Sequence, residues 1–396
     1  MPTPEPIVAN PAVVAWARAE SGYAVERAAR SIQVKPERIL AWESGDRQPT
    51  PRQLEKLAHV YRRPLSVFFL QQPPQIPPLA AEYRRLPSVE PGQESPELRL
   101  ALRQMLIRRE NALNLMGELG EPVPGFRLKA HLRESPEEVG HRLREALGIE
   151  LAEQRAWPNE WRAWSAWRGS AERIGVLVFV FSRVKLEEVR GLALLRTPLP
   201  VAAINSKEIP ESKAYTLLHE TVHLMLAAGH EEKPALKERR PASEWNKIER
   251  FAEIAASHAM VPEQAFVEQV RTMGPMRAWD IGSVRRLARR FRITPLAAAT
   301  RLRESRFMTW EAYRQWREQW DDFTATLPPR RGGIASPAEK AINRAGRPFA
   351  QLVLEALAAN RITSIEAARY LELRFDHLEA VRSHLGDLDV DRSAPA

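Results

Sequence analysis

Two histidines four residues apart, His219 and His223, lie within a leucine-rich apolar segment that Gly229 closes. The leucines around them predict a helix that ends near this glycine. Because each residue of an α-helix advances the side chain by about 100°, both imidazoles lie on one helical face and can bind a single metal ion. Glu220 lies on the same rim, where a carboxylate can accept a proton from an attacking water molecule.

A catalytic metal centre of this kind needs a third protein ligand. The chain has no cysteine, so this ligand has to be a histidine or a carboxylate. The best candidate segment is Ile248–Pro262, where Glu249 and Glu253 are four residues apart and share a helical face. Glu249 can bind the metal while Glu253 accepts a hydrogen bond from a ligating imidazole, and the reverse assignment stays open. His258 points to the opposite side of a continuous helix.

An exposed polar stripe is the alternative interpretation of the histidine pair. The surrounding leucines argue against it, because they predict burial, and unpaired histidine and glutamate side chains are costly to bury. We therefore predict one metal centre in this part of the chain.

The composition indicates a cytoplasmic protein of several domains. A chain of 396 residues exceeds one ordinary core, which predicts two to four domains. Its apolar runs are too short to cross a bilayer, and no basic segment followed by an apolar one opens the chain. No disulfide can form without cysteine, and the net charge of +9 permits nucleic-acid binding without proving it.

The chain reads as an α+β protein that is mostly helical, with three short apolar runs that predict a small sheet. These runs are 174–181, 191–195 and 201–205. A long helix is predicted from Ser95-Pro96 to Gly117 or Gly120. Proline-rich breaks at 71–78 and 328–333 divide the chain. The predicted parts are an N-terminal domain (1–70), a proline-rich linker (71–94), a metal-binding domain (95–327) and a helical C-terminal domain (334–396).

The N-terminal part carries a second pattern, in which Val25–Gly45 reads as a helix, a tight turn, a second helix and a glycine stop. Leu54, Leu57, Ala58 and Tyr61 predict a further amphipathic helix. An ordinary helical domain for dimerisation or partner binding would show the same periodicity, and the slight excess of bases over acids does not decide between them.

The central motifs resemble the ImmA/IrrE family of zinc metallo-endopeptidases. The resemblance rests on Val201-Ala-Ala-Ile-Asn205, on Tyr215–His223 and on Glu249-Arg-Phe-Ala-Glu253 with Met260-Val-Pro262. It implies a gluzincin-like fold, one Zn²⁺ per chain bound by His219, His223 and Glu249, and Glu220 as catalytic base. The strand ending in Asn205 would resemble the edge that aligns a substrate backbone. Glu253 stands where the family often has asparagine, which leaves open which glutamate touches the metal.

The N-terminal pattern resembles the Xre/Cro-type helix-turn-helix, a five-helix module, through Trp42-Glu43-x-Gly45 and Pro49-Thr-Pro51 followed by Leu54–Ala58. In such modules the second helix enters the major groove by its N-terminal end. The resemblance assigns Trp42 to the core. It assigns base contacts to Lys35, Glu37, Arg38 and Ala41, and phosphate contacts to Arg47 and Arg52.

Two functional hypotheses follow from these patterns. The first is a homodimeric DNA-binding regulator that binds a double-stranded operator. Its zinc endopeptidase domain would cleave a protein substrate, expected to be a helix-turn-helix repressor, in a stress response or a mobile element. The second is a repressor or antitoxin-like protein whose zinc domain senses or scaffolds without cleaving. The intact Glu220 favours the first hypothesis, because a scaffold has no need of a base.

Overall fold

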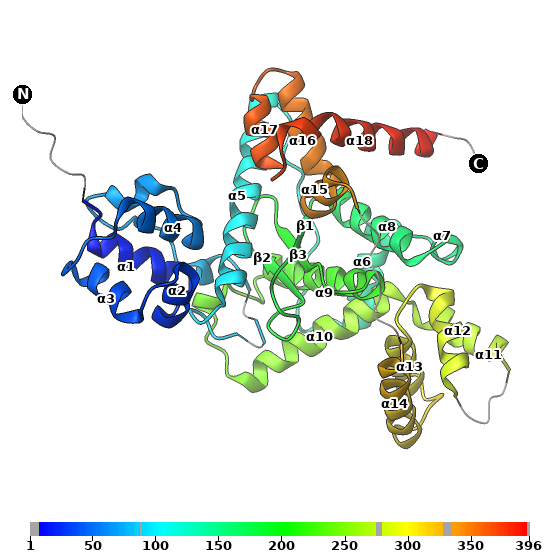
Figure 1. Ribbon diagram of the computed structural model, residues 1–396. Coiled ribbons are helices and arrows are strands. Elements are labelled where there is room, and N and C mark those ends of the chain that lie inside the picture. The colour runs from blue at the N-terminus through cyan, green and yellow to red at the C-terminus, as the bar shows by residue number, and fades with distance from the viewer. Residues whose placement is uncertain (1–7, 85, 88, 275–278, 328–334, 394–396) are drawn as a thin grey trace, which may run out of the picture.

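The computed structural model describes residues 8–84, 86–87, 89–274, 279–327 and 335–393. Helices dominate it, and one three-stranded sheet lies among them (Figure 1). This is the mostly helical α+β fold that the sequence predicts. None of the helices in these ranges combines the length and the apolar character that crossing a bilayer requires. The predicted break at 328–333 lies outside the described residues.

The N-terminal domain consists of four α-helices and a 3-10 helix around a small core. They are α1 (Pro11–Glu20), α2 (Val25–Ile32), α3 (Pro36–Ser44), α4 (Pro51–Tyr61) and η1 (Leu65–Phe69). Trp42 is 1% exposed within this core, as predicted. Gly45 ends α3 with a φ of 87°, a left-handed conformation that favours glycine. Thr50 and Gln53 form a capping box at the start of α4.

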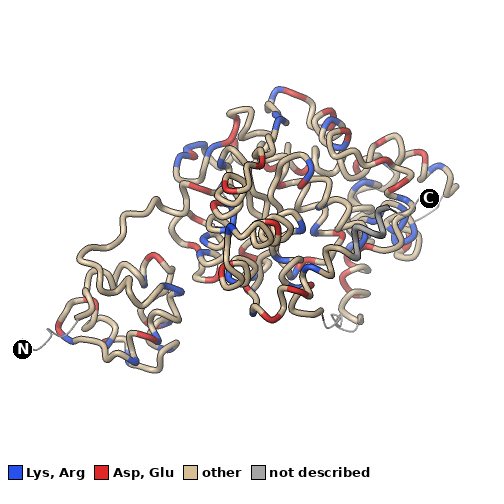
Figure 2. Tube along the Cα trace, turned by 90° about the horizontal axis from the view of Figure 1, so that it is seen from above, with Lys and Arg blue, Asp and Glu red and all other residues tan. Residues whose placement is uncertain are grey.

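The segment after this domain differs from the predicted linker. Residues 71–78 are largely exposed and join the N-terminal domain to the rest of the chain, as the extended trace in Figure 2 shows. From η2 (Leu79–Ala81) onward the segment packs into the second domain, which is the part of the chain that contains the sheet and the helices around it. Tyr83 is fully buried and pairs with Leu194, while Arg84 pairs with Pro234. The sequence carries no local signal for this packing, because the residues that pair with Tyr83 and Arg84 are more than a hundred positions away.

The sheet has the strand order β1-β3-β2. β1 (Leu177–Phe181) runs parallel to β3 (Val201–Asn205), and β2 (Gly191–Leu194) runs antiparallel to β3. The Asn205 strand is therefore central, and the expectation that it offers a free edge to a substrate is wrong. Both sides of β3 already carry hydrogen-bonded neighbours, and β1 and β2 are the edge strands.

Both faces of the sheet are covered, and successive residues of each strand enter opposite cores. Val178, Ala202 and Ile204 face one core. Leu177, Phe179 and Val201 face the other. Short strands that are buried on both faces read as continuous apolar runs, which is why the sequence predicts them correctly.

The first core is covered mainly by four helices: α6 (Pro136–Leu147), α8 (Glu160–Arg173), α9 (Pro210–Ala228) and α10 (Ala242–Met260). The last two carry the candidate site. Further helical elements extend this side: α7 (Leu151–Ala156), η3 (Ala235–Lys237), α11 (Glu263–Thr272), α12 (Ile281–Phe291), α13 (Pro295–Glu304) and α14 (Trp310–Ala325). The sequence interpretation did not single out α6 or α8.

The second core joins α5 to the C-terminal helices. α5 (Pro96–Leu119) is capped by the Ser95 side chain and ends at Gly120, as predicted. The C-terminal elements are α15 (Pro337–Ala345), α16 (Arg347–Ala358), α17 (Ser364–Tyr370), η4 (Phe375–His377) and α18 (Leu378–Ser393). They share one hydrophobic cluster with α5 and the sheet, so residues 335–385 do not form a core of their own.

We predict that Phe349→Ala destabilises the whole second domain. Phe349 is 1% exposed and its ring meets that of Phe179 in β1 edge to face, 6.0 Å between centroids. Replacing a buried phenylalanine by alanine lowers the free energy of unfolding by about 3–5 kcal/mol. Urea unfolding followed by tryptophan fluorescence measures this loss, with Ile365→Ala, at a position 77% exposed, as the control. A loss confined to a separate minor transition would show that the C-terminal helices unfold independently.

Candidate metal centre

The two histidines of α9 and a carboxylate of α10 come together beside the sheet. Nε2 of His219 lies 3.0 Å from Nε2 of His223. The Glu249 carboxylate places Oε2 3.3 Å from the first of these nitrogens and Oε1 3.6 Å from the second. Among the described residues these three form a group that could hold a metal ion. His258, on the same helix, instead meets His141 edge to face.

The histidine rings are fixed by their neighbours. Nδ1 of His223 lies 2.7 Å from Oε2 of Glu232, and both side chains are fully buried. Trp245 stacks on His223 with 6.4 Å between ring centroids, and Tyr215 stacks on His219 at the same distance. Such contacts orient an imidazole and set its tautomer. Burial, followed by the charge of Arg84, lowers the pKa of His223 well below its ordinary value, so the neutral ring that metals require is favoured.

Glu253 does not take the supporting role that the sequence predicts for it. Its side chain is exposed, although its backbone oxygen accepts a hydrogen bond from the Tyr215 hydroxyl at 3.3 Å. Glu232 contacts the ligating histidine instead. The i, i+4 spacing placed Glu253 on the correct face of α10, but one helical turn carries it beyond the reach of the imidazoles. Glu232 lies in the loop after α9, where no periodic pattern marks it.

Arg84, like Glu232, is a site residue to which the sequence analysis assigns no role. Its Nε and Nη2 donate to the two oxygens of Glu220 at 2.9 and 3.0 Å, and its Nη1 donates to Oε1 of Glu249 at 2.8 Å. The Arg84 and Glu220 side chains are 3% and 2% exposed. Burial opposes ionisation of Glu220, yet the charge and hydrogen bonds of Arg84 lower its pKa below the usual value. The same guanidinium lowers the pKa of Glu249 despite burial.

A glycine in the edge strand lets β2 approach this pair. A Cβ on Gly191 would lie 2.4 Å from Cγ2 of Thr216 and 3.0 Å from Oε1 of Glu220. A larger side chain would push α9 and its glutamate away from the strand. Gly191, His219, Glu220 and Glu249 all line a cavity of about 730 Å³ that opens between β2, α9, α10 and α13.

The predicted DNA-contacting residues lie on the surface of the N-terminal domain. Lys35 caps the start of α3, and Arg47 lies in the loop after Gly45. Lys35, Glu37, Arg38, Arg47 and Arg52 are exposed, and Ala41 is half-buried. α3 lies on the side of this domain that faces away from α5 (Figure 1). Basic and acidic residues alternate along the trace instead of gathering on this domain, so bulk charge does not mark it as a nucleic-acid interface (Figure 2).

These features define the class of protein: a helix-turn-helix domain followed by a helical domain with a potential metal centre. Comparison with known families agrees. Residues 14–68 match the helix-turn-helix family, and residues 171–303 match the IrrE N-terminal-like domain, a peptidase family. The chain therefore joins a helix-turn-helix domain to an IrrE-type domain. No curated protein matches it.

We predict that Arg84→Ala lowers the free energy of unfolding by about 3–5 kcal/mol, because Glu220 and Glu249 lose their shared counter-charge inside the protein. A bound divalent metal ion should restore part of this loss, since its charge compensates Glu249. Urea unfolding with a chelator and with added metal measures both effects.

The matched control is Arg190→Ala. Arg190 also pairs with a buried carboxylate, Glu208, but its own side chain is 66% exposed. We expect this variant to lower the free energy of unfolding by no more than about 1 kcal/mol. Equal losses for the two variants would contradict the role given to Arg84.

Proposed function

We propose that this chain is a DNA-binding regulator whose IrrE-type domain is a zinc-dependent endopeptidase. The observation that carries the proposal is the triangle of His219, His223 and Glu249 donors beside Glu220. Tetrahedral zinc with bonds of about 2.0–2.1 Å needs donor atoms about 3.3 Å apart. The two Nε2 atoms are 3.0 Å apart, and each lies within 3.6 Å of one of the two Glu249 oxygens, which is compatible with that geometry. Two imidazoles and one carboxylate are also a donor set typical of catalytic zinc.

Each residue has a distinct part in the proposed reaction. Bound zinc would supply Lewis acidity at the scissile carbonyl and at the attacking water. Glu220 would accept the proton of that water and deliver it to the leaving amine. Glu232 would keep His223 oriented, and Arg84 would keep the Glu220 carboxylate ionised and in place.

The cavity beside the centre supports a protein substrate. Its volume of about 730 Å³ and its position along the edge strand β2 suit an extended peptide. Exposed carboxylates of Glu187, Glu253 and Glu304 line it, as do the exposed arginines Arg190 and Arg250. Over the whole lining, glutamates outnumber arginines by eight to four. An acidic lining favours a substrate rich in lysine and arginine, which agrees with a DNA-binding repressor as the cleaved protein.

One observation favours a second function, in which the metal domain senses or scaffolds without cleaving. Both oxygens of Glu220 already accept hydrogen bonds from Arg84, so the base is engaged before any substrate arrives. A regulator that needs only a metal-stabilised fold would tolerate this pairing. The two functions differ in whether the intact protein cuts any chain.

A set of three variants tests the peptidase. Glu220→Gln should retain about one zinc per chain but lose cleavage by roughly 10²–10⁴-fold, because the proton acceptor is removed. Glu249→Gln should lose zinc, and Glu253→Gln should keep both zinc and cleavage. The measurements are metal analysis and electrophoresis of candidate helix-turn-helix repressors incubated with each protein.

Unchanged cleavage by Glu220→Gln would rule out this mechanism. Loss of zinc from Glu253→Gln but not from Glu249→Gln would reverse the ligand assignment. If the wild-type protein binds zinc and cuts no repressor, the scaffolding function is the better description.

Two variants test the proposed DNA interface, one at an arginine expected to contact bases and one at an arginine expected to contact phosphates. Arg38→Ala, near the leading end of α3, should weaken binding to the cognate site by about 1–3 kcal/mol and relax its sequence preference. Arg47→Ala, in the loop, should weaken binding to all sequences. It should also reduce the slope of log binding constant against log salt concentration by about one. Fluorescence anisotropy titrations of labelled DNA at two salt concentrations distinguish the two variants.

Half-sites about one helical turn apart in the bound DNA would agree with a homodimer. Equal effects on cognate and random duplexes for both variants would argue against α3 as the reading helix.

A further inference from the structure

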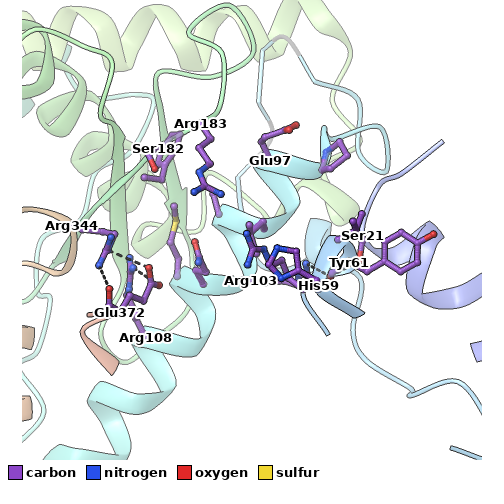
Figure 3. A pocket seen from close by; sticks show the side chains of 18 of the residues that line it. Ser21, His59, Tyr61, Glu97, Arg103, Arg108, Ser182, Arg183, Arg344 and Glu372 are labelled. Carbon is purple, nitrogen blue, oxygen red and sulfur yellow. Dashed lines mark hydrogen bonds and ion pairs between the residues drawn. The ribbon is translucent and has the colours of Figure 1, made fainter. Parts of the chain in front are cut away.

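A cavity with cationic walls lies in the seam between the N-terminal domain and α5 (Figure 3). Its volume is about 460 Å³. One wall comes from the turn after α1 and from the end of α4. The opposite wall is α5, and the inner end is formed by the residues after β1 together with Arg344 and Glu372. Neither the metal centre nor the proposed DNA interface shares these residues.

The charges in this cavity do not balance. Five arginines line it: Arg62, Arg103, Arg108, Arg183 and Arg344. Of the two carboxylates, Glu372 pairs with Arg108 at 2.7 Å and with Arg344 at 3.3 Å. Glu97 pairs with Arg27. In the described part of the chain, Arg62, Arg103 and Arg183 therefore have no carboxylate partner.

Arg103 has a buried hydrogen-bond donor without an acceptor among the described residues. Its Nη2 donates to the backbone oxygen of Tyr61 at 3.3 Å, while its Nε is buried and meets no acceptor among the described residues. Burial, and next the nearby charge of Arg63, lower the pKa of Arg103 to about 10. A buried donor without an acceptor is costly, and an anionic ligand would satisfy it.

Arg183 adds a second donor from the inner end of the cavity. It lies two residues after β1 with a φ of 73°, a left-handed conformation that non-glycine residues rarely adopt. Figure 3 shows its side chain pointing from the end of β1 towards α5. The Arg183 side chain is exposed and lines the seam cavity.

We propose that this seam cavity binds a small organic polyanion whose phosphate or carboxylate groups are held by Arg103 and Arg183. Guanidinium groups suit both kinds of oxyanion because they donate two parallel hydrogen bonds. Leu100, Met105 and Phe181 give the cavity an apolar part that suits the carbon skeleton of such a ligand. Its size and its place at a domain boundary are typical of small-molecule sites. Arg103 and Arg183 both belong to the body of the protein, and the N-terminal domain contributes Arg62 to the same cavity.

The test is isothermal titration calorimetry, in which the full-length protein at low salt is titrated with four probes. Inorganic pyrophosphate and adenosine monophosphate represent phosphates, citrate represents carboxylates, and adenosine is the uncharged control. At least one anion should bind with a dissociation constant below about 1 mM, a modest affinity for a charge-assisted site, whereas adenosine should not bind. The anions that bind decide between phosphate and carboxylate chemistry.

Arg183→Gln and Arg103→Gln should each weaken anion binding about tenfold or more, because each removes charge-assisted hydrogen bonds. Arg183→Gln is the decisive variant, because the Arg183 side chain makes no hydrogen bond or ion pair within the described residues and its loss leaves the fold intact. Arg314→Gln, at an exposed arginine of α14, is the matched control and should bind as the wild type does. No binding of any anion at millimolar concentration, or equal affinity in wild type and Arg183→Gln, would overturn the proposal.

Discussion

The buried ion pairs of Arg84 with Glu220 and Glu249 join three segments that are distant in sequence. Two carboxylates on adjacent helices repel each other in a low-dielectric interior, so α9 and α10 can bring them together only beside a compensating charge. The guanidinium supplies that charge from the segment that follows the N-terminal domain. Its backbone is fixed in turn, because Tyr83 pairs with β2 and the Arg84 N–H donates to the Ala193 oxygen. The geometry of the candidate metal centre thus depends on a residue that neither α9 nor α10 contains.

The sheet is the platform on which this arrangement rests. Its three short strands are buried on both faces, with α9 packed on one side and α5 and the C-terminal helices on the other. Because β3 is central, β1 and β2 are the edge strands, and Gly191 in β2 allows that strand to lie against Glu220. A substrate that pairs with β2 would therefore extend past the base. The segment 82–84 already uses part of the same edge, since the Leu195 N–H donates to the Glu82 oxygen.

The N-terminal domain is attached through arginines as much as through the exposed connection at 71–78. Arg99 donates to the Ala19 and Glu20 backbone oxygens at the end of α1, and Arg103 donates to Tyr61. Arginines that reach across a seam to backbone oxygens leave the seam positively charged, because carbonyls satisfy hydrogen bonds without neutralising charge. The seam cavity is the consequence of this mode of docking. It places a cationic site between the DNA-facing domain and the body of the protein.

Local patterns in the sequence determined the helices, the short strands and the first two metal-site positions. His219 and His223 are paired by helical spacing alone, and Gly45, Ser95 and Gly120 mark helix ends by conformational preference. Spacing could not choose between Glu249 and Glu253, nor find Glu232 and Arg84, because those contacts depend on how α10, the loop after α9 and residues 82–84 pack. Strand order is likewise invisible locally, so the Asn205 strand was expected at an edge that β2 occupies. Helical periodicity is a property of a few neighbouring residues. The charge that compensates Glu220 and Glu249 comes instead from Arg84, more than a hundred residues away in sequence. The order of β1, β3 and β2 depends on how the strands pack, so only the tertiary structure decides both features.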